Sequence, residues 1–249
     1  MKIFTSAQIH ELDKYTIEHE PISSLNLMER AAKALTRAIE EEWLNHTPVV
    51  IFAGPGNNGG DALAVGRMLA EDGYQVSVYL FNVHNKLSAD CAANKKRIIE
   101  GKKVKKFVEI TLNFDPPQLT AETLVIDGLF GSGLNKPLAG GFAAMVKYIN
   151  QSAAKVVSID IPSGLMTEDN SNNIHANIIH ADLTLTLQQK KLSMLMADNQ
   201  QYLGRLRVLD IRLSQEYIQN AKCRCSILEE QDVRQLLRPR SDFAHKGSM

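Results

Sequence analysis

The chain has 249 residues, of which 44% are hydrophobic, and its 28 Lys and Arg residues balance its 28 Asp and Glu residues. This length and apolar content favour one large α/β domain with a sizeable core. The balanced charge argues against a nucleic-acid or membrane-surface partner, and no apolar run reaches membrane-spanning length. Three cysteines cannot all pair within the chain and lack a zinc-binding spacing, so we expect a reduced, cytoplasmic protein.

Two helices are predicted before the first strand. Thr5-x-x-Gln8 is a capping box that opens one helix, and Pro21 ends it. Asn26-x-x-Glu29 predicts a second cap of the same kind. Apolar residues at helical spacing follow it: Met28, Ala32, Leu35 and Ile39. We expect this pair of helices to cover a face or edge of a sheet, or to form a dimer surface.

Residues 49–70 predict a strand, a glycine-rich turn and a helix. The strand is Val49–Ala53, the turn is GPGNNGGD, and the helix runs over 62–70 and stops before Gly73. Such a turn leaves backbone N–H groups free at a helix N-terminus, where they attract anions such as phosphate. A purely structural interpretation is a tight connection in which Asn57 and Asn58 tolerate left-handed backbone. Asp61 at the helix start is not required by turn chemistry and favours a binding site.

Two common phosphate-binding motifs can be tested on this turn. The Walker A loop fails because Gly60 is followed by Asp61 rather than Lys. The dinucleotide pattern G-x-G-x-x-G is met by the turn, but the acid expected at the end of the next strand is replaced by Asn82. The pattern therefore argues against an ordinary NAD-dependent oxidoreductase.

Strands and helices alternate through the rest of the chain. Strands are predicted over 75–81, 123–127, 155–160, 182–187 and 205–211, and helices over 88–101 and 142–150. The lysines at 102–106 predict a solvated rim or, alternatively, a basic patch for phosphates. This alternation predicts a Rossmann-like, three-layer α/β/α fold with a mostly parallel sheet and two extra N-terminal helices.

Three predicted strands end in loops that are rich in glycine and acid. They end after Ala53, at Asp127 and at Asp160. Each Asp alone could simply cap the next helix. Because ligands bind outside the carboxyl ends of strands in open parallel sheets, the three loops together predict a shared pocket.

These loops resemble one family. GPGNNGGD at 54–61, VIDGLFGSGL at 125–134 and SIDIPSGL at 158–165 are similar to the YjeF N-terminal domain, the NAD(P)HX epimerases. The resemblance extends over about residues 5–213, with LMERA at 27–31 and a Lys shortly after the strand at 182–187. Departures are Ala62 and Ala32 where the family usually has Gly, and Gln188-Gln-Lys190-Lys191 in place of Pro-Lys, which leaves the register of the Lys open.

The resemblance implies an isomerase that interconverts the R and S epimers of NADHX or NADPHX, with bound K⁺ and a homodimer. A partner dehydratase specific for the S epimer would complete the repair. The implied substrate-binding residues are Asn57, Asn58, Gly59, Gly60, Asp61, Gly131, Ser132, Gly133, Leu134, Asn135, Lys136, Pro137 and Asp160. The implied K⁺ ligands are Asn58, Asp127 and Ser163, and their oxygen atoms suit a hard cation.

Catalysis is assigned from the substrate's chemistry. Its hydroxyl is on a carbon beside the ring nitrogen, so a protonated hydroxyl can leave and water can return on either face, which requires an acid. We expect Asp160 to be this acid, with Lys191 as a proton relay or phosphate contact. The alternative is a non-catalytic nucleotide-binding or interaction module of the same fold. The sequence does not decide between NADHX and NADPHX.

The end of the chain is predicted to differ from the rest. We expect an epimerase domain over 1–228 and a linker, or the start of a C-terminal dehydratase domain, over 229–249. A short amphipathic segment is predicted over Glu229–Leu237, and Pro239 stops it. His245-Lys246-Gly247 resembles the opening of the dehydratase domain in bifunctional members of the family, although a flexible tail would also fit.

Overall fold

A seven-stranded parallel sheet organises the structure, a computed structural model that describes residues 1–112 and 114–236. The strand order is β4-β3-β2-β5-β6-β7-β8. The bounds are β2 Val49–Ala53, β3 Val76–Phe81, β4 Lys106–Ile110, β5 Leu124–Gly128, β6 Lys155–Ile159, β7 Leu183–Leu187 and β8 Arg205–Leu209. The α/β fold with a mostly parallel sheet is therefore confirmed. The sequence analysis missed β4, an edge strand whose side chains are mostly exposed or half-buried and therefore carry little apolar signal.

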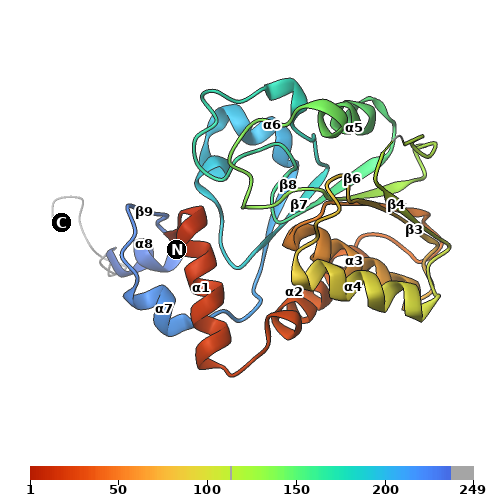
Figure 1. Cartoon of the computed structure of the whole chain (residues 1–249). Helices are drawn as coiled ribbons and strands as arrows, with labels where there is room; N and C mark the ends of the chain where they lie inside the picture. The colour runs from red at the N-terminus through yellow and green to blue at the C-terminus, as the bar shows by residue number, and fades with distance from the viewer. Residues whose placement is uncertain (113, 237–249) are drawn as a thin grey trace, which may run out of the picture.

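Helices cover both faces of this sheet (Figure 1). On one face lie α2 (Ser24–Glu40), α3 (Asn57–Glu71) and α4 (Ala89–Gly101), and on the other lie α5 (Gly140–Gln151) and the short α6 (Gln200–Leu203). Leu35, Leu63 and Ile98 pack against the first face, while Val146 and Ile149 pack against the second. The central strands are buried on both sides, as parallel sheets require.

The strand order reverses between β2 and β5. From β2 the chain crosses through α3 to β3 on one side, and it later returns to β5 on the other side of β2. In such sheets a crevice opens outside the carboxyl ends of the two strands where the order reverses. The loops that follow β2 and β5 carry the glycine motifs, so the topology places both motifs at this crevice.

The caps of three helices test the sequence predictions directly. The capping box of Thr5 and Gln8 is confirmed at α1 (Ser6–His19). The cap predicted at Asn26 is wrong, because Ser23 caps α2 by accepting a hydrogen bond from the backbone N–H of Asn26. This helix therefore begins at Ser24, before the predicted cap. Gly73 follows the end of α3 with a left-handed φ of 92°, as predicted.

The start of α3 lies earlier than predicted. Asn57–Asp61 form its first turn rather than a loop. Close packing explains why glycines are found in this turn: a Cβ on Gly59 would lie 1.8 Å from the carbonyl oxygen of Gly54, and one on Gly60 would lie 2.8 Å from the sulfur of Met28. The free N–H groups of the helix therefore begin at the glycine turn itself.

The N-terminal helix α1 stands beside the sheet rather than on it (Figure 1). It packs against α7 (Gln215–Asn220), where Leu12 joins a small apolar cluster with Ile211 and Leu213. A two-stranded antiparallel sheet of β1 (Lys2–Ile3) and β9 (Cys225–Ser226) joins the beginning of the chain to residues more than 200 positions away. The predicted pair of N-terminal helices therefore separates, with α2 on the sheet and α1 at its side.

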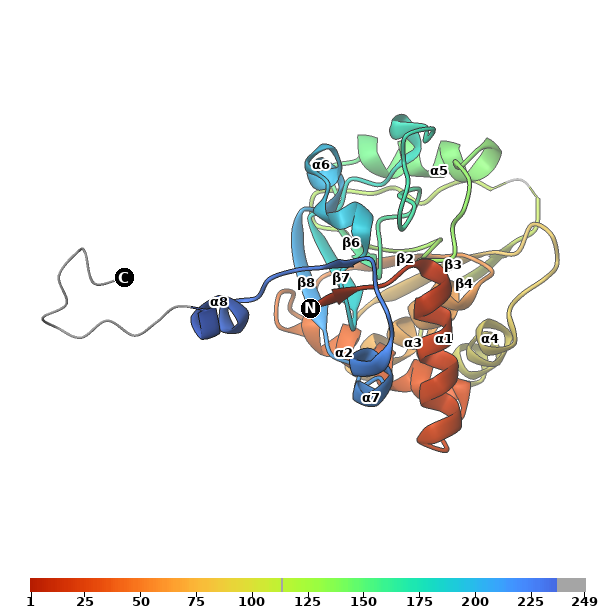
Figure 2. The same cartoon turned by 90° about the vertical axis from the view of Figure 1, so that its left-hand side faces the viewer.

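The last element described is α8 (Glu230–Leu236), where an amphipathic segment was predicted. It projects from the rest of the molecule in Figure 2. Leu237, Pro239 and His245-Lys246-Gly247 lie outside the described residues, so the predicted domain junction stays a prediction. Within the described part of the chain, no helix combines the length and apolar character needed to cross a bilayer.

Candidate active site

A cavity of about 740 Å³ opens at the carboxyl edge of the sheet, at the crevice between β2 and β5. Its walls come from α1, the start of α2, the glycine turn with the start of α3, and the loop after β5. Asp160, Gln188 and Lys191 add residues from the ends of the next two strands. The shared pocket predicted from three strand ends is therefore present as one cavity.

The glycine turn and the loop after β5 touch through their backbones. The N–H of Gly54 donates to the carbonyl of Gly128 at 3.0 Å, and a Cβ on Gly54 would lie 1.8 Å from the carbonyl oxygen of Leu129. Only glycine fits this approach. This close approach of the two loops directs the N-terminus of α3 toward the cavity. Gly56 is the N-cap of this helix, and no side chain caps it. A ligand anion can use these N–H groups.

A buried carboxylate with a full set of hydrogen bonds lies at the end of β5, outside the cavity lining. Asp127 is fully buried at the end of β5 and accepts four hydrogen bonds. Its donors are the Ser158 hydroxyl at 2.8 Å, the Ser163 N–H at 2.9 Å, the Ser163 hydroxyl at 2.5 Å and the Leu129 N–H at 3.3 Å. Burial raises the pKa of Asp127, and the bonds from the serines and Leu129 oppose that rise. This carboxylate ties the loop after β5 to β6 and to the loop that follows β6.

The predicted K⁺ ligands converge on this network. Ser163 Oγ accepts from the N–H of Phe130 at 2.9 Å, and Asn58 packs against Gly131, so both lie at the loop after β5. Asn58 would offer its amide oxygen to a cation, since its Nδ2 is a hydrogen-bond donor. One carboxylate with neutral amide and hydroxyl oxygens suits a large monovalent cation, so Asn58, Asp127 and Ser163 fit K⁺. A metal site built from three or more His, Cys, Asp or Glu side chains is a different kind of site, and none is found among the residues described.

Asp160 and Lys191 form a buried ion pair at the edge of the cavity. The side chain of Lys191 is 1% exposed, and its ammonium group also donates to Thr186 Oγ1 at 2.7 Å and to the Leu187 carbonyl at 3.2 Å. All three of its protons are used, so it has none left for a phosphate. The register of the Lys is resolved: Lys191 is buried, and Lys190 does not line the cavity.

The backbone of Asp160 is unusual. Its φ of 66° lies in the left-handed region, which non-glycine residues rarely adopt. The carboxylate accepts from the N–H of Ser132 at 3.3 Å and from that of Leu187 at 3.4 Å, in addition to Lys191. Strained residues of this kind cluster at functional sites. The arrangement fixes a negative charge beside the cavity.

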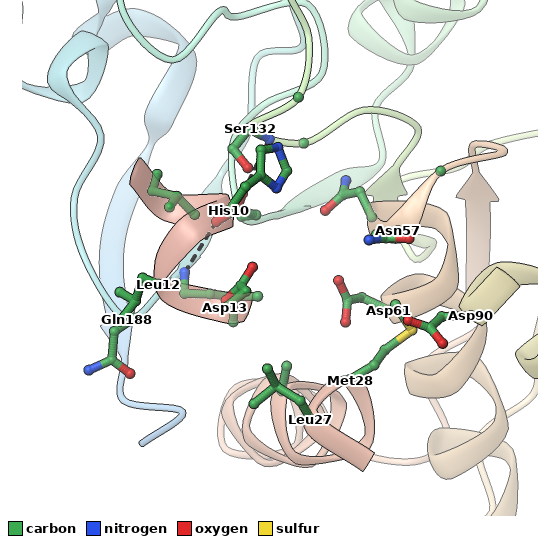
Figure 3. A pocket seen from close by; sticks show the side chains of 18 of the residues that line it. His10, Leu12, Asp13, Leu27, Met28, Asn57, Asp61, Asp90, Ser132 and Gln188 are labelled. Atoms are coloured by element: carbon green, nitrogen blue, oxygen red, sulfur yellow. Dashed lines mark hydrogen bonds between the residues drawn. The ribbon is translucent and has the colours of Figure 1, made fainter. Parts of the chain in front are cut away.

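Two further carboxyl groups enter the cavity without partners. Asp61 on α3 and Asp13 on α1 point toward each other from facing walls (Figure 3). Within the described residues, neither carboxyl accepts a hydrogen bond. Burial, followed by the charge of Asp160, raises the pKa of Asp13 to about 6, and the nearby Lys191 partly opposes this. Burial and the charges of Asp160, Asp13 and Asp90 raise the pKa of Asp61 well above its ordinary value.

Most of the predicted substrate-binding residues line the cavity. These are Asn57, Asn58, Asp61, Gly131, Ser132, Gly133, Leu134, Asn135, Lys136 and Asp160. Gly59, Gly60 and Pro137 do not line it, and neither do Asp127 and Ser163. The lysines at 102–106 are exposed and do not line it either.

Sequence reasoning missed Asp13 and Asp90 as cavity residues. A signal for Asp13 exists in α1. Ile9, Leu12, Asp13, Thr16 and Ile17 follow the i, i+3, i+4, i+7, i+8 spacing of a buried helical stripe, and Asp13 is the acid within it. An acid at such a position calls for a buried partner or a chemical role.

Comparison with known proteins gives consistent matches. Residues 24–193 match the family model described as the YjeF-related protein N-terminus. The chain is 34% identical to a protein named NAD(P)H-hydrate epimerase from Limosilactobacillus fermentum, covering 83% of this chain and 95% of that protein. It is 36% identical to one of the same name from Oenococcus oeni, with 83% and 95% covered.

Two other matches concern longer and solved proteins. The chain is 30% identical to the Bifunctional NAD(P)H-hydrate repair enzyme Nnr of Coxiella burnetii, covering 99% of this chain and 49% of that protein. The crystal structure of yeast ynu0, YNL200c, has a TM-score of 0.64 and 23% identity, and the alignment covers 80% of this chain and 86% of that one. The likeness to the yeast protein shows the fold.

Proposed function

Since the chain belongs to the family of YjeF-related N-terminal domains, we propose that it is an NAD(P)H-hydrate epimerase, an isomerase that interconverts the R and S epimers of NADHX and NADPHX. The observation that carries this function is the cavity at the strand-order reversal, which is lined by the glycine loops and by the carboxyl groups of Asp13, Asp61 and Asp160. The glycine turn suits the phosphates of a dinucleotide, and the carboxyl groups suit a reaction that passes through a cation.

The chemistry follows from the substrate. Its hydroxyl is on the carbon beside the ring nitrogen, so the nitrogen lone pair can expel a protonated hydroxyl as water. The ring then carries a positive charge as an iminium ion, and water can add back to either face. A site for this reaction needs a source of a proton and a fixed negative charge near the ring.

Asp160 is the residue that we place beside the reacting carbon. Its carboxylate is held by Lys191 and by two backbone N–H groups, and so it cannot turn away from the cavity. Because its partner is a buried ammonium group, we assign Asp160 the stabilisation of positive charge rather than delivery of the proton. Lys191 acts through Asp160, since it fixes the position of that carboxylate.

The N-terminus of α3 and the loop after β5 are assigned to the rest of the substrate. The free N–H groups beginning at Gly56 suit a diphosphate, and Lys136, which lines the cavity, adds a positive charge on the same side. Asn58, Asp127 and Ser163 would hold K⁺ below these loops. When bound, the ion would supply positive charge near the phosphates and fix the loop after β5.

Two partners are also proposed. The S epimer would be consumed by an NAD(P)H-hydrate dehydratase, and the match to half of a protein named as a bifunctional repair enzyme supports this coupling. A homodimer stays a prediction, and light scattering after size exclusion would test it.

A coupled assay tests the epimerase function. The purified chain is added to a mixture of NADHX epimers together with a dehydratase specific for the S form. We expect the R form to disappear faster than it does spontaneously, and NADPHX is tested in parallel. Consumption of R at the spontaneous rate, in the presence of K⁺, would instead favour a non-catalytic binding module.

A further inference from the structure

Asp13 and Asp61 lie on different elements and on facing walls of one cavity. Asp13 belongs to α1, which stands beside the sheet, and Asp61 belongs to the first turn of α3, next to the glycine turn. In Figure 3 their carboxyl groups point toward each other across open space. Asp61 is nine-tenths buried, and the groups that act on it are other charges rather than hydrogen-bond donors.

The position of Asp13 is built into the fold. The first residue of α1, Ser6, donates from its hydroxyl to the Ser132 carbonyl at 2.7 Å and from its backbone N–H to Glu168 at 2.7 Å. Farther along the helix, Thr16 Oγ1 accepts from the N–H of Ser214 at 2.9 Å. The contact with Ser132 holds α1 against the loop after β5, which itself lines the cavity, while the other two hold it to the loop after β6 and to the start of α7. Asp13 is therefore held at the cavity by contacts on both sides of it in the helix.

Epimerisation at a planar cation has a geometric requirement. The hydroxyl leaves from one face of the ring, and water must return on the opposite face. One acid cannot reach both faces of a ring held in a single pose, because a proton transfer needs hydrogen-bond distance. A site with acids on two facing walls meets this requirement without turning the substrate.

We propose that Asp13 and Asp61 are the two acid–base groups of the epimerase, each serving one face of the substrate ring, with the Asp160–Lys191 pair beside them. This assignment rests on the epimerase function proposed above. Each of the four groups then has a distinct role. Asp13 and Asp61 exchange protons with water, Asp160 stabilises the cation, and Lys191 fixes that stabilising carboxylate.

The reaction balances with the groups present. The protonated carboxyl on the hydroxyl's face gives its proton to the hydroxyl oxygen, and the carbon–oxygen bond breaks with its electron pair leaving in water. The ring nitrogen's lone pair forms the carbon–nitrogen double bond. A water on the other face then forms a new carbon–oxygen bond, its proton goes to the carboxylate on that face, and the electron pair returns to nitrogen. One water leaves and one water is added. The first carboxyl has then lost a proton to the departing water, and the second carboxyl has gained a proton from the attacking water.

The burial and charges around Asp13 and Asp61 favour a single proton held between their two carboxyl groups. The mechanism needs one of the two carboxyls protonated and the other ionised at the start of each turnover. Burial raises the pKa of both groups, and the charge of Asp13 further raises that of Asp61, so ionisation of one favours protonation of the other. The other carboxyls nearby are already engaged: Asp127 has its serine and backbone donors, Asp160 has Lys191, and Asp90 accepts from the Ser24 hydroxyl.

Isotope exchange without inversion tests the two faces separately. NADHX is prepared with ¹⁸O in the ring hydroxyl, its epimers are separated, and each is incubated in ordinary water with the wild-type chain, Asp13→Asn or Asp61→Asn. Chromatography with mass spectrometry then measures ¹⁸O loss from the recovered starting epimer and the amount of inverted product, both corrected for the spontaneous rates. Each substitution keeps the shape of the side chain and removes its proton transfer.

We expect the wild type to invert both epimers and to exchange both. Each variant should lose inversion in both directions by at least about 100-fold, the usual contribution of a general acid. Each should keep exchange for one epimer only, and the two variants should keep opposite epimers. The retained exchange also shows that each variant is folded and binds substrate.

Other outcomes overturn the proposal. A variant that slows exchange of both epimers equally, or that inverts them within a few-fold of wild type, would remove its residue from this role. If the wild type itself does not invert NADHX, the epimerase function fails first, and so the two failures are distinguishable. Glu11→Gln is the matched control, since Glu11 is an exposed acid on α1 that does not line the cavity and accepts from the Tyr217 hydroxyl at 2.9 Å. It should leave exchange and inversion unchanged.

Discussion

Asp127 and Asp61 are both buried carboxyl groups at the same edge of the sheet, and burial raises the pKa of each, but their surroundings differ. Asp127 accepts four hydrogen bonds from β6 and from the loops after β5 and β6, whereas Asp61 faces other carboxyl groups across the cavity. A buried carboxylate whose hydrogen bonds are all formed stabilises the fold, because its removal leaves the buried donors without an acceptor. An unsatisfied one costs stability and is available for proton transfer.

The Asp160–Lys191 pair shares one property with Asp127 and another with Asp61. It is buried and satisfied like Asp127, yet it lines the cavity like Asp61. The comparison therefore separates three kinds of carboxyl within one site. Four substitutions test that separation.

Lys191→Met should cause the largest change. It leaves the Asp160 charge without its buried cation, which costs about 3–5 kcal/mol of unfolding free energy. Denaturant unfolding measures this loss. Lys190→Met is the control, because that neighbour lies outside the cavity and should change stability by less than about 0.5 kcal/mol. Similar losses in both variants would mean that the ion pair does not stabilise the site.

Asp160→Asn should remove epimerisation while leaving ligand binding intact. An amide keeps the shape but not the negative charge that stabilises the iminium ion, so we expect a rate loss of roughly 100- to 1,000-fold. The coupled assay measures the rate, and calorimetry with NADH measures binding. A rate within a few-fold of wild type would rule out the charge-stabilising role.

Asp127→Ala should act on stability and in a way that depends on K⁺. Removing a buried acceptor leaves its donors unsatisfied and should cost about 2–4 kcal/mol. If Asp127 also holds K⁺, the fall in Tm should be greater in potassium buffer than in tetramethylammonium buffer, because a bound ion stabilises the folded state by mass action. Equal losses in both buffers would leave Asp127 as a brace between loops without a bound ion.

Asp13→Asn should have a smaller effect on stability than Lys191→Met or Asp127→Ala, seen as a change in the pH dependence of stability. The folded state raises the pKa of Asp13 from 3.8 to about 6, so the folded protein binds this proton more tightly than the unfolded chain does. The wild type should therefore lose on the order of 1–3 kcal/mol as pH rises from about 4 to above 6. The asparagine variant lacks this loss and should be the more stable of the two at pH 7, when both are compared relative to pH 4.

Thermal unfolding of both proteins across this pH range checks the sign. The difference between the two curves reports the titration of Asp13 together with its effect on Asp61, because the charge of Asp13 also raises the pKa of Asp61. A difference that does not change between pH 4 and pH 7 would mean that the cavity does not perturb Asp13.

Local patterns in the sequence predicted much of the fold because they depend on neighbouring residues. The capping box at Thr5, the strand Val49–Ala53 and the stop at Gly73 each follow from a few adjacent side chains. The cap at Ser23 was missed because Asn26 offered a similar local pattern three residues later, whereas Asn26 itself donates its backbone N–H to the Ser23 hydroxyl. Strand β4 was missed because an edge strand buries too little apolar surface to show alternation.

The sequence by itself determined the chemistry at the ends of the strands. The glycine motifs and the acids Asp127 and Asp160 follow strands directly, and parallel strands bring their carboxyl ends to one edge. Tertiary structure alone decided which lysine pairs with Asp160 and that Asp13 enters the cavity. Lys191 and Asp160 are 31 positions apart in the chain, and Asp13 faces Asp61 from a different helix. Both placements depend on where whole helices and loops pack. Local propensity carries no information about such distances, because it is set by backbone and side-chain interactions within a few residues.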